Sequence, residues 1–307
     1  MVGIGTILAS AGGVFITSAS NITISLNNIS ESARWGIAVR SNGKAQSYNN
    51  TIDRNWIKRT GLRTADFGAI SFIDHGAGHG NTTGNRVIGN CVRETKGMRD
   101  SFTETGELGK IYNNYFGRAL YLDDHTSNVE ITGNIFVDTS ANAIFFHSGN
   151  YNTAQNNVFV NATVLAAKTG GQLLFKEITH GHIYPQVGNV LERNVVWSPR
   201  AADEEGHEVP LYEGRAQAVG GKGGKVEANL YYRPGIPMKG DSLFFGKSWA
   251  QWKKEGHDTH GLLNADPGFI DARGGDFNLR GDSPLPALGF LPLPMPLCPR
   301  AVDVGEP

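Results

Sequence analysis

Five segments of this chain align with one another, and this internal repetition constrains the fold more strongly than any single motif. Each segment is a short β-prone run followed by an Asn-rich turn and a second short β-prone run. The five lie at residues 36–41, 68–74, 118–124, 142–148 and 171–177. Units of about 20 to 40 residues with one or two strands each are typical of a solenoid. Equivalent strands of successive coils stack into parallel sheets with a spacing of about 4.8 Å. We therefore expect a functional site along a column of stacked side chains.

The composition agrees with a fold of short strands and tight turns, because 40 of the 307 residues are Gly. Gly and Asn supply the left-handed backbone positions that such turns need. The charge is nearly balanced, with 28 Lys and Arg against 29 Asp and Glu. The absence of a basic tract argues against nucleic acid as the main partner. No apolar run reaches the roughly 20 residues of a membrane-spanning helix, so no membrane partner is expected.

We expect one all-β domain over residues 1–307, with coils over about 15–234 and a C-terminal cap and tail over about 235–307. Ser248 is a candidate N-cap for a short helix over 248–256. The segment after this helix is expected to cover the last coil. The Pro-rich tail cannot extend a sheet, so it should run as an extended strap.

The N-terminus lacks the Lys or Arg that opens a secretory signal. It leads directly into a coil-like segment at 15–30. A solenoid that begins in this way leaves an exposed strand edge, which normally needs a capping element. The sequence leaves open a fragment, a mature form, or a chain whose first coil is covered by a partner, and self-association through the first coil is one form of such cover.

Asparagines precede an apolar pair in successive repeats, at Asn28, Asn55, Asn90, Asn114, Asn134, Asn157 and Asn194. Stacked Asn side chains can bond to the backbone and to one another, which satisfies turn groups that would otherwise be buried unpaired. The set therefore predicts an asparagine ladder. The two cysteines, Cys91 and Cys298, lie far apart without a metal or redox spacing. We expect one to be a buried small residue and the other a tail residue.

Two neighbouring columns carry most of the candidate chemistry. One is predicted to hold Ser41, Ile73, Asp123, His147 and Lys176, and the next to hold Asp74, Asp124, Ser148 and Glu177. Side chains alternate along a strand, so a core-facing Leu120 and Leu122 make Tyr121 and Asp123 the outward pair. If the strand ends there, Asp124 belongs to the turn and could cap backbone amides.

Carboxylates on an outer sheet face are suited to sugar chemistry. Glycoside hydrolysis needs an acid and a second carboxylate, about 5 Å apart for retention or 6.5–9.5 Å apart for inversion. Asp74 with Asp123 or Asp124, or Asp124 with Glu177, could meet these distances.

Other residues in the columns would suit a polysaccharide lyase. Arg118, Lys176, His147 and Tyr121 supply bases and cations for that reaction, and Asp74, Asp123 and Asp124 could hold Ca²⁺ through oxygen ligands. The loop that begins at His75 offers histidines for substrate or turn contacts. The sequence contains no established metal-binding pattern, so we expect no metal or other cofactor, with Ca²⁺ as the alternative.

Several stretches resemble right-handed parallel β-helix carbohydrate-active proteins. Those like consecutive coils lie at 63–72, 117–136 and 152–163, and those like the closing segment lie at 248–271 and 276–290. The resemblance covers nearly the whole chain and implies a right-handed parallel β-helix, with secretion or a periplasmic location in a bacterium. Members include β-xylosidases and fucosidase- or xylanase-type hydrolases.

The resemblance also implies roles for individual residues. In the xylosidase-like branch the nucleophile maps onto Asp123, but the stretch that should supply the acid has Phe146 and His147 instead of a carboxylate. In the other branch a pair of Asp residues acts, which implies Asp66 with Asp123 or Asp124. The stacking register places Asp66 at the far end of its strand from Asp123, and favours Asp74 instead.

The resulting hypothesis is a glycoside hydrolase that cleaves a plant or algal poly- or oligosaccharide. Asp123 would be the nucleophile or base, and Asp66 or Asp74 the acid. The residues expected to line the sugar subsites are Asp124, His147, Arg118, Lys176, Glu177, Tyr121 and His75. Two alternatives stay open: a polysaccharide lyase that acts by β-elimination on uronate polymers, and a non-catalytic carbohydrate-binding or tailspike-like β-helix.

Overall fold

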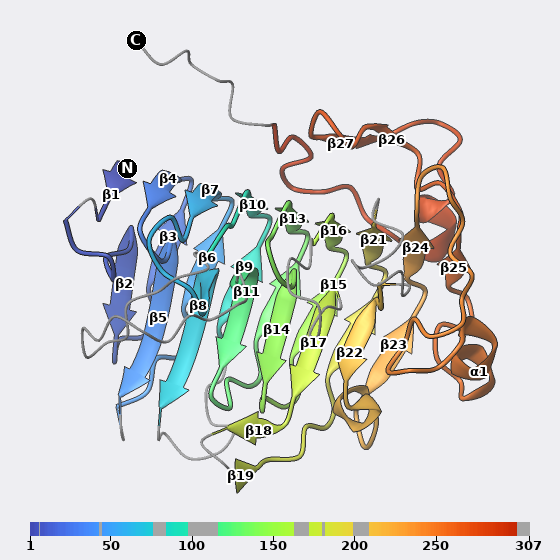
Figure 1. Cartoon of the computed structure of the whole chain (residues 1–307), viewed down its shortest axis with the longest axis horizontal. Helices are drawn as coiled ribbons and strands as arrows, with labels where there is room; N and C mark the ends of the chain where they lie inside the picture. The colour runs from blue at the N-terminus through green and yellow to red at the C-terminus, as the bar shows by residue number, and fades with distance from the viewer. Residues whose placement is uncertain are drawn as a thin grey trace.

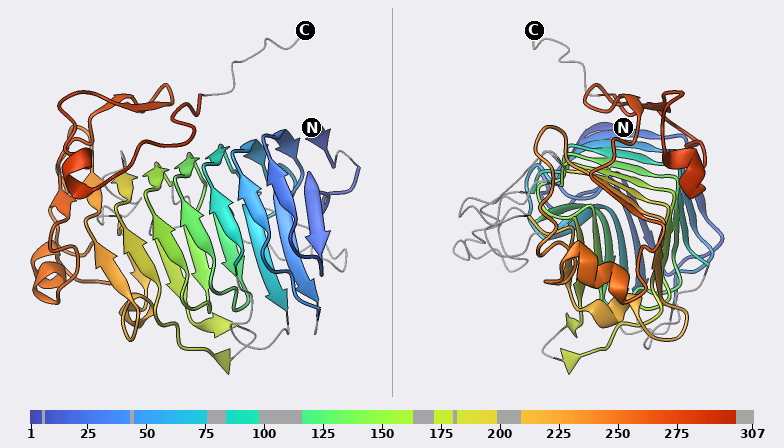
Figure 2. Two further views of the ribbon diagram at one scale, coloured as in Figure 1. Left: turned by 180° about the vertical axis from the view of Figure 1, so that it is seen from behind. Right: turned by 90° about the vertical axis from the view of Figure 1, so that its right-hand side faces the viewer.

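A computed structural model describes residues 1–5, 7–42, 45–75, 84–97, 116–162, 172–179, 182–198 and 209–299. Three parallel sheets dominate it (Figure 1), and the first seven coils each contribute one strand to each sheet, while β24 (Leu230–Tyr232) and β25 (Leu262–Leu263) extend only the first sheet. The right-hand view of Figure 2 looks along the stack, with the sheets wrapped around a common interior. The predicted all-β, right-handed parallel β-helix is confirmed.

The strands of each sheet come from successive coils. Sheet A has nine, namely β1 (Val2–Ile4), β4 (Asn28–Ser32), β7 (Trp56–Thr60), β10 (Cys91–Arg93), β13 (Ile135–Val137), β16 (Val158–Val160), β21 (Val195–Trp197), β24 (Leu230–Tyr232) and β25 (Leu262–Leu263). Sheet B has seven, namely β2 (Val14–Thr17), β5 (Ile37–Asn42), β8 (Phe67–His75), β11 (Gly117–Asp123), β14 (Ile144–His147), β17 (Leu173–Lys176) and β22 (Tyr212–Gly214). Sheet C has seven, namely β3 (Thr23–Ser25), β6 (Thr51–Asp53), β9 (Arg86–Ile88), β12 (Glu130–Thr132), β15 (Thr153–Gln155), β20 (Val190–Glu192) and β23 (Lys225–Glu227).

The remaining elements lie outside these sheets. They are the strand pairs β18 (Ile178–Thr179) with β19 (His182–Ile183) and β26 (Phe269–Asp271) with β27 (Asp276–Leu279), the helix α1 (Trp249–Lys254), and the 3-10 turns η1 (Ala216–Val219) and η2 (Leu285–Leu288). Both strand pairs are antiparallel.

Apolar side chains at equivalent positions of successive coils form the core. One inward column of sheet B consists of Ile37, Ile70, Leu120, Ile144 and Leu173, each paired with the next. All five are fully buried. Burying a side chain of this size is worth about 1.5–3 kcal/mol relative to exposure. Because side chains alternate along a strand, these columns fix which residues of sheet B face outward.

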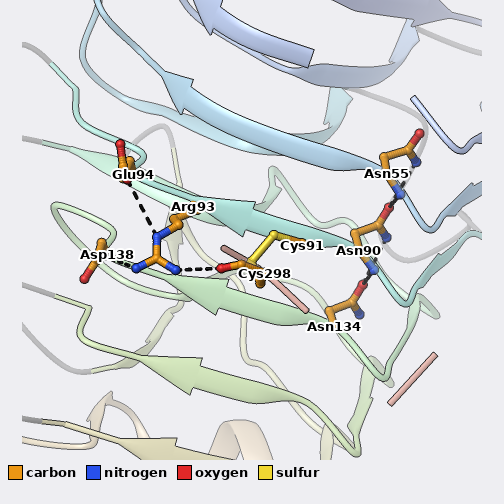
Figure 3. The surroundings of a disulfide bond; sticks show 8 residues. All are labelled: Asn55, Asn90, Cys91, Arg93, Glu94, Asn134, Asp138 and Cys298. Carbon is orange, nitrogen blue, oxygen red and sulfur yellow. Dashed lines mark hydrogen bonds and ion pairs between the residues drawn. A yellow bond between two sulfur atoms is a disulfide. The ribbon is translucent and has the colours of Figure 1, made fainter. Parts of the chain in front are cut away.

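An asparagine ladder runs along the turn before sheet A. Its members are Asn27, Asn55, Asn90, Asn134, Asn157, Asn194 and Asn229, and each side-chain amide donates to the carbonyl oxygen of the next. Figure 3 shows three of them. Asn55, Asn90, Asn134, Asn157 and Asn194 were predicted correctly, whereas the first member is Asn27 and not Asn28, and Asn229 was not predicted. Asn114 lies outside the described residues.

A carboxylate ends the ladder at the C-terminal coil. Asp258 accepts hydrogen bonds from the backbone and side-chain amides of Asn229, at 3.0 and 2.9 Å. It also accepts from the Tyr231 hydroxyl at 2.7 Å and from the Trp252 indole at 3.1 Å. Trp252 belongs to α1, which begins as predicted, with Ser248 as its N-cap. Asp258 therefore joins the ladder to the helix that covers this end of the solenoid.

The sequence predicted that the closing segment covers the last coil. In the structure this segment, residues 261–299, also extends beyond the last coil. Figure 1 shows it running back over the strands of sheet A toward the N-terminal end. An apolar cluster joins the outer face of sheet A to this segment, with Ile135, Val158, Val195 and Leu230 on the sheet and Phe269, Phe277, Leu285, Phe290 and Leu293 on the segment. This outer face is apolar, and packing it against the closing segment removes it from water.

The cysteines form a disulfide between Cys91, in β10, and Cys298 (Figure 3). The expectation of a buried small residue and an unconnected tail residue was wrong. Spacing in sequence did not show the pairing, because the closing segment returns across four coils to reach β10. The Pro-rich tail is an extended strap as predicted, and Pro294 lies so close to Gly89 and Gly133 that a Cβ at either would come within 3.0 or 2.8 Å of it.

The first coil leaves one edge of each main sheet uncovered. β1, β2 and β3 are terminal strands of sheets A, B and C, and within the described part of the chain no other strand pairs with their outer edges. Ile7, Leu8 and Phe15 near this edge are largely exposed. Among the described residues, no helix has the length and apolar character needed to cross a bilayer.

Candidate functional site

The candidate site lies where the strands of sheet B end. Asp123 is the last residue of β11, and it pairs with Ile73 of the preceding coil. His147 is the last residue of β14, and it pairs with Lys176 of the following coil. The predicted column is therefore correct from Ile73 to Lys176. Its first member is Arg40 and not Ser41, because Arg40 pairs with Ile73.

Asp123 and His147 form a direct contact between neighbouring coils. The Asp123 Oδ1 to His147 Nδ1 distance is 2.8 Å, and the Tyr121 hydroxyl lies 3.3 Å from the same nitrogen. The Asp123 side chain is 20% exposed and that of His147 12%. When Nδ1–H donates to Asp123, the other ring nitrogen of a neutral imidazole carries the lone pair. The contact thus holds His147 in a tautomer that can accept a proton at Nε2.

Asp124 joins this pair from the turn that follows β11. Its φ is +42°, so the strand alternation ends at Asp123. Its amide donates to Asp123 Oδ1 at 3.0 Å. One donor atom from each of Asp123, Asp124 and His147 lies within 4.8 Å of the others. The sequence correctly placed Asp124 in the turn, and the structure adds that its carboxylate lies beside Asp123.

These three side chains could hold a divalent cation. The sequence analysis had considered Asp74, Asp123 and Asp124 as oxygen ligands for Ca²⁺. The structure brings an imidazole into the group in place of the Asp74 carboxylate. An oxygen-only set suits Ca²⁺, whereas a mixed nitrogen and oxygen set also suits transition metals.

Arg118 covers the aromatic part of the site. Its guanidinium lies 4.5 Å from the Tyr121 ring centre and 4.6 Å from that of Phe145. Strict alternation would place Arg118 and Tyr121 on opposite faces. The amides of the consecutive residues Ala119 and Leu120 both donate to the next coil, and this irregularity allows Arg118 to reach the outer face.

Tyr121 and Phe145 support the site without forming a sugar platform. Their rings stack at 4.8 Å, and the Phe145 ring stacks on His147 at 5.1 Å. They are only 5% and 3% exposed, so a sugar ring has little access to them. Burial, followed by the negative charges of Asp123 and Asp66, raises the pKa of Tyr121 well above its ordinary value. Tyr121 therefore keeps its proton.

Asp66 lies at the other end of sheet B from Asp123. It precedes Phe67, which pairs with Gly117, whereas Asp123 pairs with Ile73. Seven residues of strand separate Asp66 from Ile73, or about 23 Å at 3.3 Å per residue. The Asp66 side chain is 61% exposed and forms an ion pair with Arg118 at 2.8 Å. Although the two backbone positions are far apart, the Asp66 side chain is linked to the site through Arg118, whose guanidinium lies over the Tyr121 ring, and no direct contact between Asp66 and Asp123 is found among the described residues.

Other predicted residues have different surroundings. Asp74 and Glu177 are both buried. Glu177 accepts a hydrogen bond from the Gln186 amide at 3.2 Å and forms an ion pair with Arg215 at 3.3 Å. These contacts stabilise the chain after β17. Lys176 is exposed beside His147.

The remaining positions to compare with the sequence prediction are His75 and the neighbouring residues Phe145 and Phe146. His75 ends β8, where it pairs with Asn42, and its side chain lies outside the described part of the structure. Phe145 was not predicted as a site residue, and Phe146, which stands where the resemblance implied a carboxylate, is fully buried in the core. The sequence analysis placed Leu120 and Leu122 toward the core. Because Leu122 pairs with Phe146, the same alternation predicts that Phe146 faces the core and Phe145 faces outward.

The comparison with protein families agrees with this architecture. The model of a family described as right handed beta helix region matches residues 6–177, more than half of the chain. The chain belongs to this family. The matched part of this β-helix protein includes every candidate residue from Asp66 to Glu177. Membership fits carbohydrate-active proteins of the pectate lyase or glycoside hydrolase kind in general, without specifying the reaction. No curated protein matches the chain.

Proposed function

We propose that this β-helix protein is a glycoside hydrolase and that its active site is the cluster of Asp123, Asp124 and His147. The observation that carries the proposal is the approach of two carboxylates and an imidazole at the end of β11. Glycoside hydrolysis needs one carboxyl group to protonate the leaving oxygen and a second to act as nucleophile or base. Adjacent positions on a turn supply both within one site.

The roles of nucleophile or base and of proton donor are assigned to Asp123 and Asp124 by their burial and contacts. Asp123 is the more accessible and accepts hydrogen bonds from His147 and from the Asp124 amide, which hold its carboxylate in place. We assign it the role of nucleophile or base. Asp124 is 5% exposed, and a neutral carboxyl group is less costly to bury than a charged one. We assign it the role of proton donor, in place of Asp66 or Asp74.

The remaining residues would position the site and its substrate. His147 orients the Asp123 carboxylate, and Tyr121 and Phe145 fix the imidazole from the side. Arg118 is buried and its charge is paired with Asp66, whereas Lys176 is exposed next to this group. Lys176 would pair with an acidic group on the sugar chain.

The same cations support a second candidate, a polysaccharide lyase. That reaction needs a base for the proton next to a uronate group and positive charge to neutralise the carboxylate. A His147 held by Asp123 could be the base, with Arg118 and Lys176 beside it to neutralise the uronate carboxylate. The two reactions differ in their product, because elimination leaves an unsaturated sugar that absorbs ultraviolet light.

The test is a reducing-end assay on plant and algal polysaccharides and aryl glycosides, with ultraviolet absorbance recorded in the same wells. New reducing ends without absorbance gain, lost in Asp123→Asn, would support hydrolysis. An absorbance gain would identify a lyase. No turnover on any substrate, with binding that Asp123→Ala leaves intact, would favour a non-catalytic carbohydrate-binding protein.

We also infer that the protein functions in a secreted or periplasmic setting. The disulfide between Cys91 and Cys298 supports this inference, because disulfides persist in oxidising compartments and are rare in the cytosol. Fractionation of the producing cells would test it: recovery of the oxidised protein only in the cytosol would contradict the proposal.

A further inference from the structure

A cavity separate from the candidate site lies between sheet A and the closing segment. Its volume is about 230 Å³. Sheet A contributes Arg93, Trp197 and two valines, the turns after its strands contribute Asp138 and Asn161, and the closing segment contributes Arg273. The residues described for the candidate site come from sheet B and the turn after it, so the two sites share no side chain.

A network of hydrogen bonds fixes the polar wall of this cavity. Arg93 donates to the Asp138 carboxylate at 3.3 Å and to the Cys298 carbonyl oxygen at 2.6 Å (Figure 3). Asn161 donates to the other oxygen of Asp138 at 2.7 Å. Asp138 and Asn161 both have φ above +50°, so each follows its strand in the same left-handed turn. The wall is therefore organised before any ligand arrives, and the disulfide-linked strap helps to hold it.

The opposite wall combines apolar surface with positive charge. Trp197 is 8% exposed and lines the cavity together with the two valines. Arg273 is exposed, and no ion pair is found for it within the described part of the chain. Arg93 is paired with Asp138 and with Glu94 behind the wall, so among the described lining residues Arg273 supplies the positive charge that a ligand could meet.

We propose that this cavity binds a single sugar residue that carries a carboxylate or sulfate group. The accessible edge of the indole would contact the C–H face of the sugar, and the two valines, which are 1% and 3% exposed, would form the floor beneath it. Asp138 and Asn161 would bond to its hydroxyl groups, and Arg273 would pair with the anionic substituent through charge-assisted hydrogen bonds. Four of the eight lining residues are apolar and four are polar or charged, and fixed polar groups in a concave site set the orientation of a small ligand.

The consequence is a second point of attachment for an anionic polysaccharide. A chain bound in this cavity leaves the outer face of sheet B open, so a polymer could be held at one site while another segment occupies the other. Linking two weak sites in this way raises the overall affinity for a polymer without changing the affinity for a short sugar. The inference does not depend on the reaction proposed for Asp123.

Electrophoresis of the full chain through native gels that contain polygalacturonate or alginate tests the proposal, with neutral arabinoxylan gels for comparison. The variants are Arg273→Gln and Arg273→Glu. Lys222→Gln is the matched control, because Lys222 is also exposed and loses the same charge. We expect anionic gels to retard the wild type and Lys222→Gln, and the apparent affinity to fall about tenfold in Arg273→Gln, the usual effect of losing one charge-assisted bond. Arg273→Glu should bind more weakly still.

Three results would overturn the proposal: equal retardation of Arg273→Gln and Lys222→Gln, equal retardation in neutral and anionic gels, or no retardation of the wild type in any gel. Turnover of a short substrate is measured on the same preparations. The Arg273 variants should keep it, because Arg273 lies outside the candidate site. Loss of retardation with turnover intact separates this cavity from the site on sheet B. If the wild type shows no turnover, the expected pattern of retardation would still support sugar binding in this cavity.

Discussion

Replacing Asp258 by Asn tests whether a buried carboxylate is needed to end the asparagine ladder. Asp258 is fully buried, and its Oδ2 accepts from both Tyr231 and Trp252. An Asn can keep the bonds to Asn229 through its carbonyl oxygen. Its NH₂ group would then face two donors, so both hydrogen bonds at that position are lost.

The expected loss of stability follows from those two bonds. A hydrogen bond to a charged group contributes about 1.5–3 kcal/mol, and a buried donor left unpaired costs about 1–3 kcal/mol. The Tyr231 hydroxyl can turn toward Tyr212, whose oxygen lies 2.7 Å away, whereas the Trp252 N–H cannot. Removing a buried charge offsets part of the loss. We therefore expect the free energy of unfolding to fall by about 3 kcal/mol.

Urea unfolding followed by circular dichroism measures this change. Asp241→Asn is the matched control, because it makes the same substitution at an exposed position. The control should differ from the wild type by no more than about 0.5 kcal/mol. If Asp258→Asn also unfolds within that margin, the carboxylate is not needed to terminate the ladder, and this reasoning about the C-terminal coil is wrong.

Three further results are expected. Changing Cys91 and Cys298 to Ser together should lower the free energy of unfolding by about 5 kcal/mol, because the bond closes a loop of 207 residues; an unchanged denaturant midpoint would contradict this. Burial lowers the pKa of His257 below 6.5, so the unfolded chain binds more protons in that range and stability should fall as the pH drops below 6.5. His257→Gln should flatten this pH dependence, and an equally steep curve would exclude His257 as the cause. If the first coil mediates self-association, Phe15→Lys should lower the mass measured by light scattering, and a concentration-independent monomer for the wild type would rule that association out.

The repeat pattern was sufficient to predict the fold, because stacking imposes the same residue types at the same position in every coil. The alignment of segments such as 118–124 and 142–148 placed Asp123 beside His147, and the structure confirms that neighbourhood. The ladder was predicted for the same reason. Both depend on local sequence and on the short distance between successive coils.

The features that were missed depend on backbone irregularities and on distant contacts. Arg118 reaches the face of Tyr121 only because the strand alternation is interrupted beside it. Asp124 turns toward Asp123 through a left-handed residue, which residue type alone does not specify. The disulfide required knowledge of the path of the closing segment. The pairing of Asp66 with Asp123, implied by resemblance, stays a prediction, because Asp66 reaches the site only through Arg118, which lies over the Tyr121 ring.

The most direct test of the proposed active site compares Asp123→Asn with Asp66→Asn on whichever substrate the wild type cleaves. Both variants remove one negative charge with little change in shape, but only Asp123 belongs to the cluster with Asp124 and His147. We expect kcat/KM to fall by at least about a thousandfold in Asp123→Asn, a loss of about 4 kcal/mol of transition-state stabilisation. Asp66→Asn should stay within about tenfold of the wild type. A large loss in Asp66→Asn with Asp123→Asn still active would place the chemistry at the other end of sheet B and contradict the assignment.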